Sequence, residues 1–173
     1  IVEKSNIQKI AEKFDVVFTG SDQVWNDKIT GRDDTYYLNF IPEKKRFSYA
    51  ASIGSNTIPT ENIPRVKKLL AGFNKISVRE SSAVEALKTQ LDISAVQVLD
   101  PTLLLTKNDY ISLAEYPQGQ EKFVLLYMLV YSETLLKSAK KKAEQLGISV
   151  FCINASGKRI KGVVDKSFVG IEE

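Results

Sequence analysis

The sequence predicts an α/β fold built on parallel sheets, and two observations support this fold class. Short apolar runs alternate with segments whose apolar residues recur at helical spacing, which is the pattern of parallel strands joined by crossover helices. Polar residues and glycines follow most of the apolar runs, where the loops at the carboxyl ends of the strands would lie. The content of 43% hydrophobic and 26% charged residues is typical of a globular protein with a buried core.

The first 118 residues are predicted to form one α/β domain. A short lead-in with apolar residues at helical spacing precedes the apolar run 15–20, which is typical of a buried strand. Further strands are expected at 46–53, 75–78 and 95–99. Helices are expected at 60–73 and 81–91, and a short one begins at Thr106 and stops before Pro117.

A domain boundary is predicted in the polar segment 116–122, which contains Pro117 and Gly119, so the domains are residues 1–118 and 119–173. Beyond the boundary, a strand at 123–131 precedes a helix that Ser132 can cap and Gly147 can end. A further strand at 148–153 completes one strand–helix–strand unit. The remaining residues are too few to close a second full domain.

Composition excludes several classes of function. The net charge of +3, from 24 basic and 21 acidic residues, does not call for nucleic acid as a partner. With no histidine and a single cysteine, Cys152, the chain has no zinc or iron–sulfur pattern, so no metal is expected. No apolar run is long enough for a transmembrane segment, and no Gly-x-Gly-x-x-Gly or Walker-type loop is present. The lone cysteine and the lack of a signal peptide at Ile1 favour a cytoplasmic location.

The loop 20–26 is the most informative motif, because it places small, acidic, amide and indole groups directly after a buried strand. Gly20 allows close backbone approach to a ligand, Asp22 can orient or deprotonate a hydroxyl, and Trp25 can stack on a sugar ring. A structural alternative remains open. Asp22 and Asn26 would then cap a turn while Trp25 anchors the loop in the core.

Three other groups of polar residues follow predicted strands. Ser52 lies at the end of the second strand, although small residues there also suit tight packing. Arg79 and Glu80 precede a helix start, where free N–H groups attract anions. Alternatively these two residues form an ion pair that only fixes the loop, although adjacent side chains seldom face one another. Asp100 precedes a proline, where it can also belong to a simple turn.

Together these segments resemble the polysaccharide pyruvyltransferase family. The loop 20–26 is similar throughout to the family's Gly-Ser/Gly-Asp-Gln-x-Trp-Asn loop, and segments 47–54, 76–80 and 98–105 are similar to later family motifs, in the same order. The resemblance implies a Rossmann-like parallel sheet domain and the start of a second one, a glycosyltransferase-like two-domain architecture that is truncated here.

The resemblance also implies a function, that of a bacterial transferase of exopolysaccharide biosynthesis. Such an enzyme moves the pyruvyl group of phosphoenolpyruvate onto two hydroxyls of a saccharide as a ketal, with phosphoenolpyruvate as donor substrate and no further cofactor. On this chain the implied catalytic residues are Asp22, for the acceptor hydroxyl, and Arg79, for an anionic group. The implied substrate-binding residues are Gly20, Ser21, Gln23, Trp25, Asn26, Ser52, Glu80 and Asp100.

The sequence departs from the family pattern in two places, and other functions stay open. The family's Gly-rich segment before Asp15 and its later Arg/His-containing segment have no counterpart, so the chain is expected to be a fragment that is inactive alone. The alternatives are a nucleotide-sugar-dependent glycosyltransferase and a noncatalytic carbohydrate-binding relative.

Two structural expectations follow. The loops after Gly20, Ser52 and Val78 should converge at one edge of the sheet. The last strand–helix–strand unit should expose an apolar face, so that it docks onto the first domain or pairs between chains in a homo-oligomer.

Overall fold

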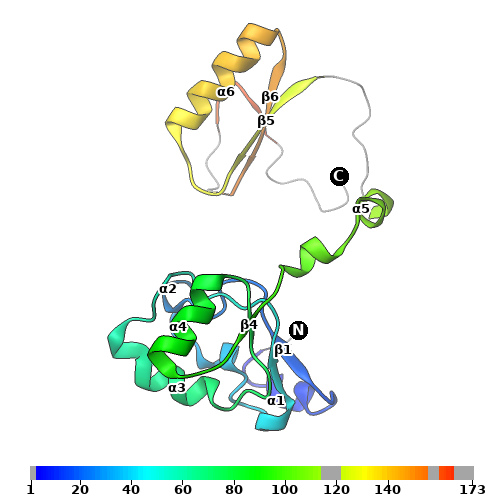
Figure 1. The fold of residues 1–173 in the computed structure, drawn as a ribbon. Coiled ribbons are helices and arrows are strands. Elements are labelled where there is room, and N and C mark those ends of the chain that lie inside the picture. The colour runs from blue at the N-terminus through cyan, green and yellow to red at the C-terminus, as the bar shows by residue number, and fades with distance from the viewer. Residues whose placement is uncertain (1–2, 114–121, 156–159, 166–173) are drawn as a thin grey trace. The chain divides into compact units, whose positions relative to one another are not determined.

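The computed structural model describes residues 3–113, 122–155 and 160–165. The chain divides into two compact units, Ile1–Thr106 and Lys107–Glu173, and each is described here by itself (Figure 1). The boundary predicted at residue 118 falls in the segment 114–121, which lies outside the described residues, so that boundary stays a prediction.

Unit 1 contains four short strands in two parallel pairs, which isolated bridges join into an irregular sheet. The strands are β1 (Val17–Thr19), β2 (Arg46–Ser48), β3 (Ser77–Val78) and β4 (Val96–Gln97). β1 pairs with β2 and β3 pairs with β4, both in parallel, and isolated parallel bridges at Phe47–Lys75 and Ala51–Val78 join β2 to β3. The α/β fold with parallel sheets predicted from the sequence is therefore confirmed.

β2 and β3 are shorter than predicted because serine hydroxyls interrupt the backbone ladder between them. The Ser48 hydroxyl donates to the Ser77 carbonyl and accepts from the Ser77 N–H. The Ser77 hydroxyl donates to the Ser48 carbonyl and accepts from the Ala50 N–H. Both serines are buried, so these side-chain bonds pair backbone groups that a regular ladder would otherwise have to satisfy.

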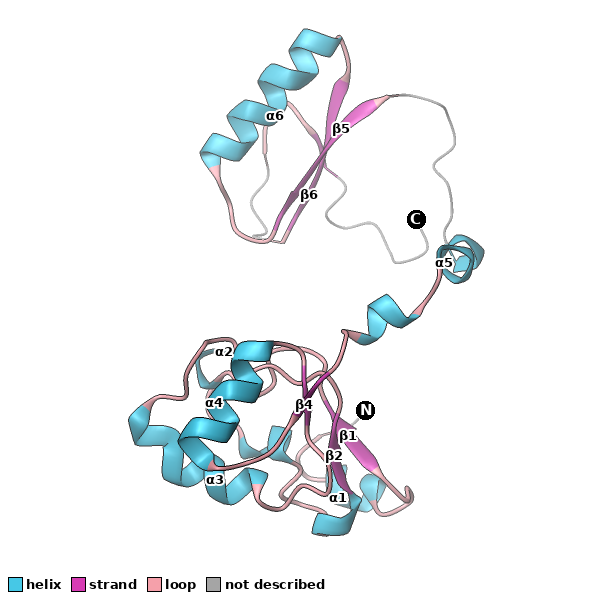
Figure 2. Cartoon of the chain, in the orientation of Figure 1, coloured by secondary structure: helices cyan, strands magenta, loops and turns pink. Residues whose placement is uncertain are grey.

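Two helices pack against the unit 1 core, α3 (Ile63–Leu70) and α4 (Ser81–Leu91), as Figure 2 shows. The bounds of α4 agree with the prediction. α3 is shorter than predicted because Thr60–Asn62 forms a separate 3-10 turn. The other helical elements are α1 (Ile7–Ala11), α2 (Asp27–Thr30) and 3-10 turns at Asp34–Tyr37, Glu43–Lys45 and Pro101–Leu104. The core includes Trp25, Tyr37, Ala51, Ile53, Val66, Leu70, Val78, Leu87 and Leu91.

Unit 2 is a strand–helix–strand unit with one added strand. After α5 (Lys107–Leu113), β5 (Phe123–Met128) and β6 (Ser149–Asn154) pair in parallel over their full lengths. β7 (Val164–Asp165), which the sequence did not predict, adds to the free edge of β6. The connecting helix α6 (Glu133–Leu146) begins as predicted, with the Ser132 hydroxyl accepting from the Leu135 N–H at 3.3 Å, and ends at Gly147 in a left-handed conformation.

Among the described residues of unit 2, helix α6 covers one face of the sheet and the other face is left exposed. α6 covers the face that carries Leu126 and Met128. On the other face Phe123 stacks on Phe151 with ring centroids 4.5 Å apart, and Leu125 is 60% exposed. The predicted apolar face is thus present among the described residues. Docking or self-association through this face stays a prediction. None of the described helices has the length and apolarity that a membrane crossing requires.

Candidate functional site

The loops that follow the strands of unit 1 meet at one edge of its sheet. The Trp25 N–H donates to the Ser52 carbonyl at 3.1 Å, and the Ser52 N–H donates to the Asp22 carbonyl at 3.1 Å. The Arg79 guanidinium donates from Nη1 to the Ser21 carbonyl at 3.0 Å. These bonds join the loops after β1, β2 and β3, so the structure brings together the three loops that were predicted to converge.

Gly20 is required by the geometry at the start of the loop 20–26. Its φ of 120° is one that residues with a side chain rarely adopt, and a Cβ atom there would lie 2.1 Å from the Tyr49 carbonyl oxygen. The close approach of this backbone to the β2 chain therefore excludes any side chain at Gly20. The loop that follows is positioned by this contact.

The polar side chains of the loop divide into bound and available groups. Asn26 donates from Nδ2 to the Gln23 Oε1 at 2.7 Å and caps α2 by accepting from the Lys28 N–H at 3.1 Å. Gln23 and Asn26 therefore hold the loop shape. The Asp22 carboxylate accepts from the Gln23 N–H at 2.7 Å and belongs to an exposed residue, so it remains accessible to a ligand.

Trp25 belongs to the core. Its side chain is only 4% exposed, stacks on Tyr37 at 5.7 Å with an angle of 8° between the rings, and contacts Phe73 with its edge. Its Nε1 donates to the Tyr36 carbonyl at 3.3 Å. This is the structural alternative considered from the sequence, and an indole held in this way is not available to stack on a sugar ring.

Ser52 also lies beneath the site rather than in it. The residue is 1% exposed, and its hydroxyl accepts from the Gly54 N–H at 3.0 Å. A Cβ atom on Gly54 would approach both Gln23 and Asn26 to 2.3 Å, so the two loops are in tight contact. The geometry gives Ser52 a role in packing the loops and offers no route for it to touch a substrate.

Arg79 is the centre of an ion-pair cluster. Its Nε donates to the Glu80 carboxylate at 2.9 Å and its Nη1 to the Asp100 carboxylate at 3.2 Å. The expectation that adjacent side chains seldom face one another is wrong for Arg79 and Glu80, because the chain turns sharply between β3 and α4. The hydrogen bond that Arg79 donates to Glu80, followed by the one it donates to Asp100, raises the pKa of Arg79 above its ordinary value.

Asp100 is fixed by its own turn as well as by Arg79. Its Oδ1 accepts from the Thr102 N–H at 3.0 Å and from the Thr102 hydroxyl at 2.8 Å. These bonds, and then the one from Arg79, hold the pKa of Asp100 below its ordinary value. One cation thus faces two carboxylates, which compete with an anionic substrate for Arg79.

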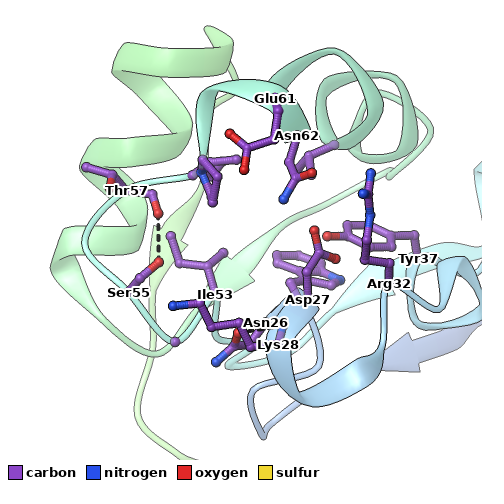
Figure 3. A pocket seen from close by; sticks show the side chains of 15 residues that line it. Asn26, Asp27, Lys28, Arg32, Tyr37, Ile53, Ser55, Thr57, Glu61 and Asn62 are labelled. Carbon is purple, nitrogen blue, oxygen red and sulfur yellow. Dashed lines mark hydrogen bonds between the residues drawn. The ribbon is translucent and has the colours of Figure 1, made fainter.

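A cavity of about 490 Å³ lies beside the loop 20–26, at the ends of β1 and β2. Figure 3 shows the side chains of Asp27, Tyr37 and Asn62 turned toward the space at its centre. Asp27 pairs with Arg65, which also pairs with Asp34 and lies over the Tyr37 ring at 5.7 Å. No pattern in the sequence predicted this group. Asp27 directly follows the motif, but nothing local marks Arg65 or Tyr37 as its partners.

Metal binding has no support in the described part of the chain, where no group of three or more cysteine, aspartate or glutamate side chains is arranged to hold an ion. The chemistry available at this edge of the sheet is that of an exposed carboxylate, an ion-pair cluster and a polar cavity.

Comparison with known proteins gives one match. The family model described as polysaccharide pyruvyl transferase matches residues 2–172. No curated protein and no solved structure matches the chain.

Proposed function

The chain belongs to the polysaccharide pyruvyl transferase family, a family of transferases, and from this premise we propose that it is a part, inactive alone, of an enzyme that transfers the pyruvyl group of phosphoenolpyruvate to a saccharide. Two hydroxyls of the acceptor are joined as a pyruvyl ketal of a polysaccharide or its precursor. The observation that carries the proposal is the convergence of Ser21, Asp22, Arg79 and Asp100 at one edge of a parallel sheet, where α/β enzymes bind their ligands.

The reaction needs protonation of the enol carbon, loss of a proton from each of two hydroxyls, and the departure of phosphate. A proton adds to the terminal enol carbon, and an acceptor hydroxyl attacks the cationic central carbon as it loses its proton. The bond from that carbon to the phosphate oxygen then breaks, and a second hydroxyl attacks and loses its proton to close the ketal. One hydroxyl proton balances the proton added to carbon, and the other leaves with inorganic phosphate.

Asp22 and Arg79 have distinct roles in this scheme. The exposed carboxylate of Asp22 accepts a proton from an acceptor hydroxyl. Arg79 contacts an anionic group of phosphoenolpyruvate after Asp100 or Glu80 gives way. In the proposal Glu80 and Asp100 keep Arg79 oriented before the donor binds, while Gly20, Gln23 and Asn26 fix the loop that carries Asp22.

Paired substitutions test the role of Arg79. We expect Arg79→Gln to weaken phosphoenolpyruvate binding by about tenfold or more, the scale of one charged hydrogen bond. Asp100→Asn should strengthen binding of the donor, because it removes a competing negative charge and keeps the oxygen that caps Thr102. Calorimetric titration measures both. Equal weakening by the two variants would mean that Arg79 only supports the loop.

The same titration separates the proposal from its alternatives. Selective binding of nucleotide sugars would replace it with a glycosyltransferase, and binding of saccharide alone would indicate a noncatalytic relative. Formation of a ketal and of inorganic phosphate by the full-length protein in the presence of both substrates is the direct test.

We also propose the Rossmann-like two-domain architecture, a cytoplasmic location and a homo-oligomeric state. The parallel sheets in both units support the two-domain architecture. The free thiol of Cys152, which is buried against α6, suits the reducing conditions of the cytoplasm. The exposed apolar face of β5 supports the homo-oligomeric state.

A further inference from the structure

The cavity beside the loop 20–26 has the position and size of a ligand site. Its volume of about 490 Å³ falls in the range of small-molecule pockets. Asn26 lies in its wall at the end of the motif loop, and Gly54 lies in its wall after β2. The 3-10 turn Thr60–Asn62 encloses it from the other side, as Figure 3 shows for Glu61 and Asn62.

Two polar atoms in the cavity wall are buried without a hydrogen-bond partner among the described residues. They are the hydroxyl oxygen of Tyr37 and Oδ1 of Asn62, in residues that are 1% and 6% exposed. An unpaired buried polar group destabilises the folded chain, and a ligand that pairs with it recovers that free energy on binding. Burial raises the pKa of Tyr37 well above its ordinary value, so its hydroxyl stays protonated and can both donate and accept.

The charges around the cavity do not favour the donor substrate. Two acidic residues, Asp27 and Glu61, and two basic residues, Lys28 and Arg32, line it. The lining therefore has no excess positive charge to attract the carboxylate and phosphate of phosphoenolpyruvate. A nucleotide base is also disfavoured, because Trp25, which has the largest ring in the lining, is buried against Tyr37 and Phe73.

We propose that this cavity binds the saccharide acceptor as a neutral, polyhydroxylated ring, whose hydroxyls pair with Tyr37 and Asn62. The assignment of this saccharide as the acceptor rests on the proposed function. Both wall atoms are covered in the ligand-free chain, so binding includes a movement of side chains that line the cavity. Asn26 links the cavity to the motif loop that carries Asp22.

Tyr37→Phe tests the proposal, because it removes the hydroxyl and keeps the ring that stacks on Trp25. The probes are neutral hexoses, N-acetylhexosamines and their disaccharides. Their binding to the 173-residue chain is measured by saturation-transfer NMR. We expect about fivefold weaker saccharide binding than in the unsubstituted chain. The midpoint of thermal unfolding should be equal or higher, since an unpaired buried hydroxyl is gone. Tyr36→Phe is the control, because Tyr36 is exposed and does not line the cavity.

A second pair of variants guards against an effect of Tyr37 on the core. Thr57 is exposed and lines the cavity, whereas Thr60 is exposed and does not. Thr57→Val should weaken saccharide binding by about threefold, and Thr60→Val should leave it unchanged. Unchanged affinity in both Tyr37→Phe and Thr57→Val, or no saccharide binding by the unsubstituted chain, overturns the proposal.

Parallel titrations with phosphoenolpyruvate keep the two proposals separate. Saccharide binding that depends on Tyr37, without donor binding or ketal formation, would leave the cavity assignment in place and remove the proposed function. Ketal formation with a saccharide affinity that is unchanged by substitution of Tyr37 and Thr57 would support the proposed function and remove the cavity assignment.

Discussion

The two units build their parallel sheets in different ways. In unit 1 the four strands are two or three residues long, and buried serine hydroxyls pair with the backbone between β2 and β3. In unit 2, β5 and β6 pair without interruption over six residues each. The irregular sheet carries the loops with polar side chains. The regular one carries a capped helix on one face and an apolar surface on the other.

This difference indicates where the chain keeps its chemistry. In unit 1, side chains and backbone of distant loops are fixed to each other, which holds Asp22 and Arg79 near one edge of the sheet. In unit 2, β5 and β6 pair through a regular ladder and α6 carries a side-chain cap at Ser132. We therefore expect unit 1 to be sensitive to single atoms in its loops, and unit 2 to respond to loss of apolar volume.

Gly20→Ala should have the largest effect. The added Cβ would lie 2.1 Å from the Tyr49 carbonyl oxygen, and the alanine would have to adopt a φ of 120°. Unit 1 should therefore lose more than about 3 kcal/mol of stability. Gly31→Ala is a matched control, because Gly31 also has positive φ but has open space around it, and it should cost about 1 kcal/mol. Trp25, the single tryptophan, reports unfolding of unit 1 by fluorescence. Similar losses in the two variants would show that the close approach at Gly20 is not what holds the loop.

Leu126→Ala should have the next largest effect, and it tests the two faces of unit 2. Leu126 is 3% exposed under α6, so its truncation should cost about 2–5 kcal/mol. Leu125 points to the other face and is 60% exposed, so Leu125→Ala should cost less than about 1 kcal/mol. Hydrogen exchange of the β5 amides measures the loss of stability in each variant. A large loss in Leu125→Ala that depends on protein concentration would show that the exposed face is covered by another copy of the chain.

The sequence predicted the helices better than the strands. α4 and α6 follow from apolar periodicity with clear ends, Ser132 and Gly147 for α6. The extent of β2 and β3 could not be predicted, because it depends on hydroxyls of Ser48 and Ser77 that meet only in the folded chain. β7 has two residues and no detectable pattern.

The candidate site was predicted in part for the same reason. The convergence of the loops follows from parallel strand topology, which a sequence can indicate. Whether a polar or aromatic residue faces a ligand or the core depends on partners far along the chain. Trp25 is buried by Tyr37 and Phe73, and Arg65 reaches Asp27 across 38 positions. Neither contact has a local signal in the sequence.

The smallest predicted effect concerns Asp33, a loop residue of unit 1 whose contribution depends on pH. A hydrogen bond from Lys4, followed by bonds from Thr35, lowers the pKa of Asp33 from 3.8 to about 2. Because the pKa in the folded chain is below that in the unfolded chain, the stabilisation is complete above the unfolded value. It is lost as pH falls from about 4 through about 2. The Lys4 side chain is 72% exposed, so screening by water limits the contribution to less than about 1 kcal/mol.

Asp33→Asn isolates this charge, because asparagine keeps the oxygen that accepts from the Thr35 N–H at the start of the 3-10 turn. Urea unfolding followed by Trp25 fluorescence should show the variant less stable than the unsubstituted chain at pH 7, with the difference shrinking as the pH approaches 2. Lys4→Gln should produce the same loss, and 1 M salt should reduce both, since the Debye length is then about 3 Å. A difference that persists at pH 2 would assign the effect to the cap rather than to the ion pair. The loop at Asp33 would then depend on the geometry of its hydrogen bonds and not on charge. The loop at Gly20 likewise depends on local geometry, which Gly20→Ala disturbs by steric overlap.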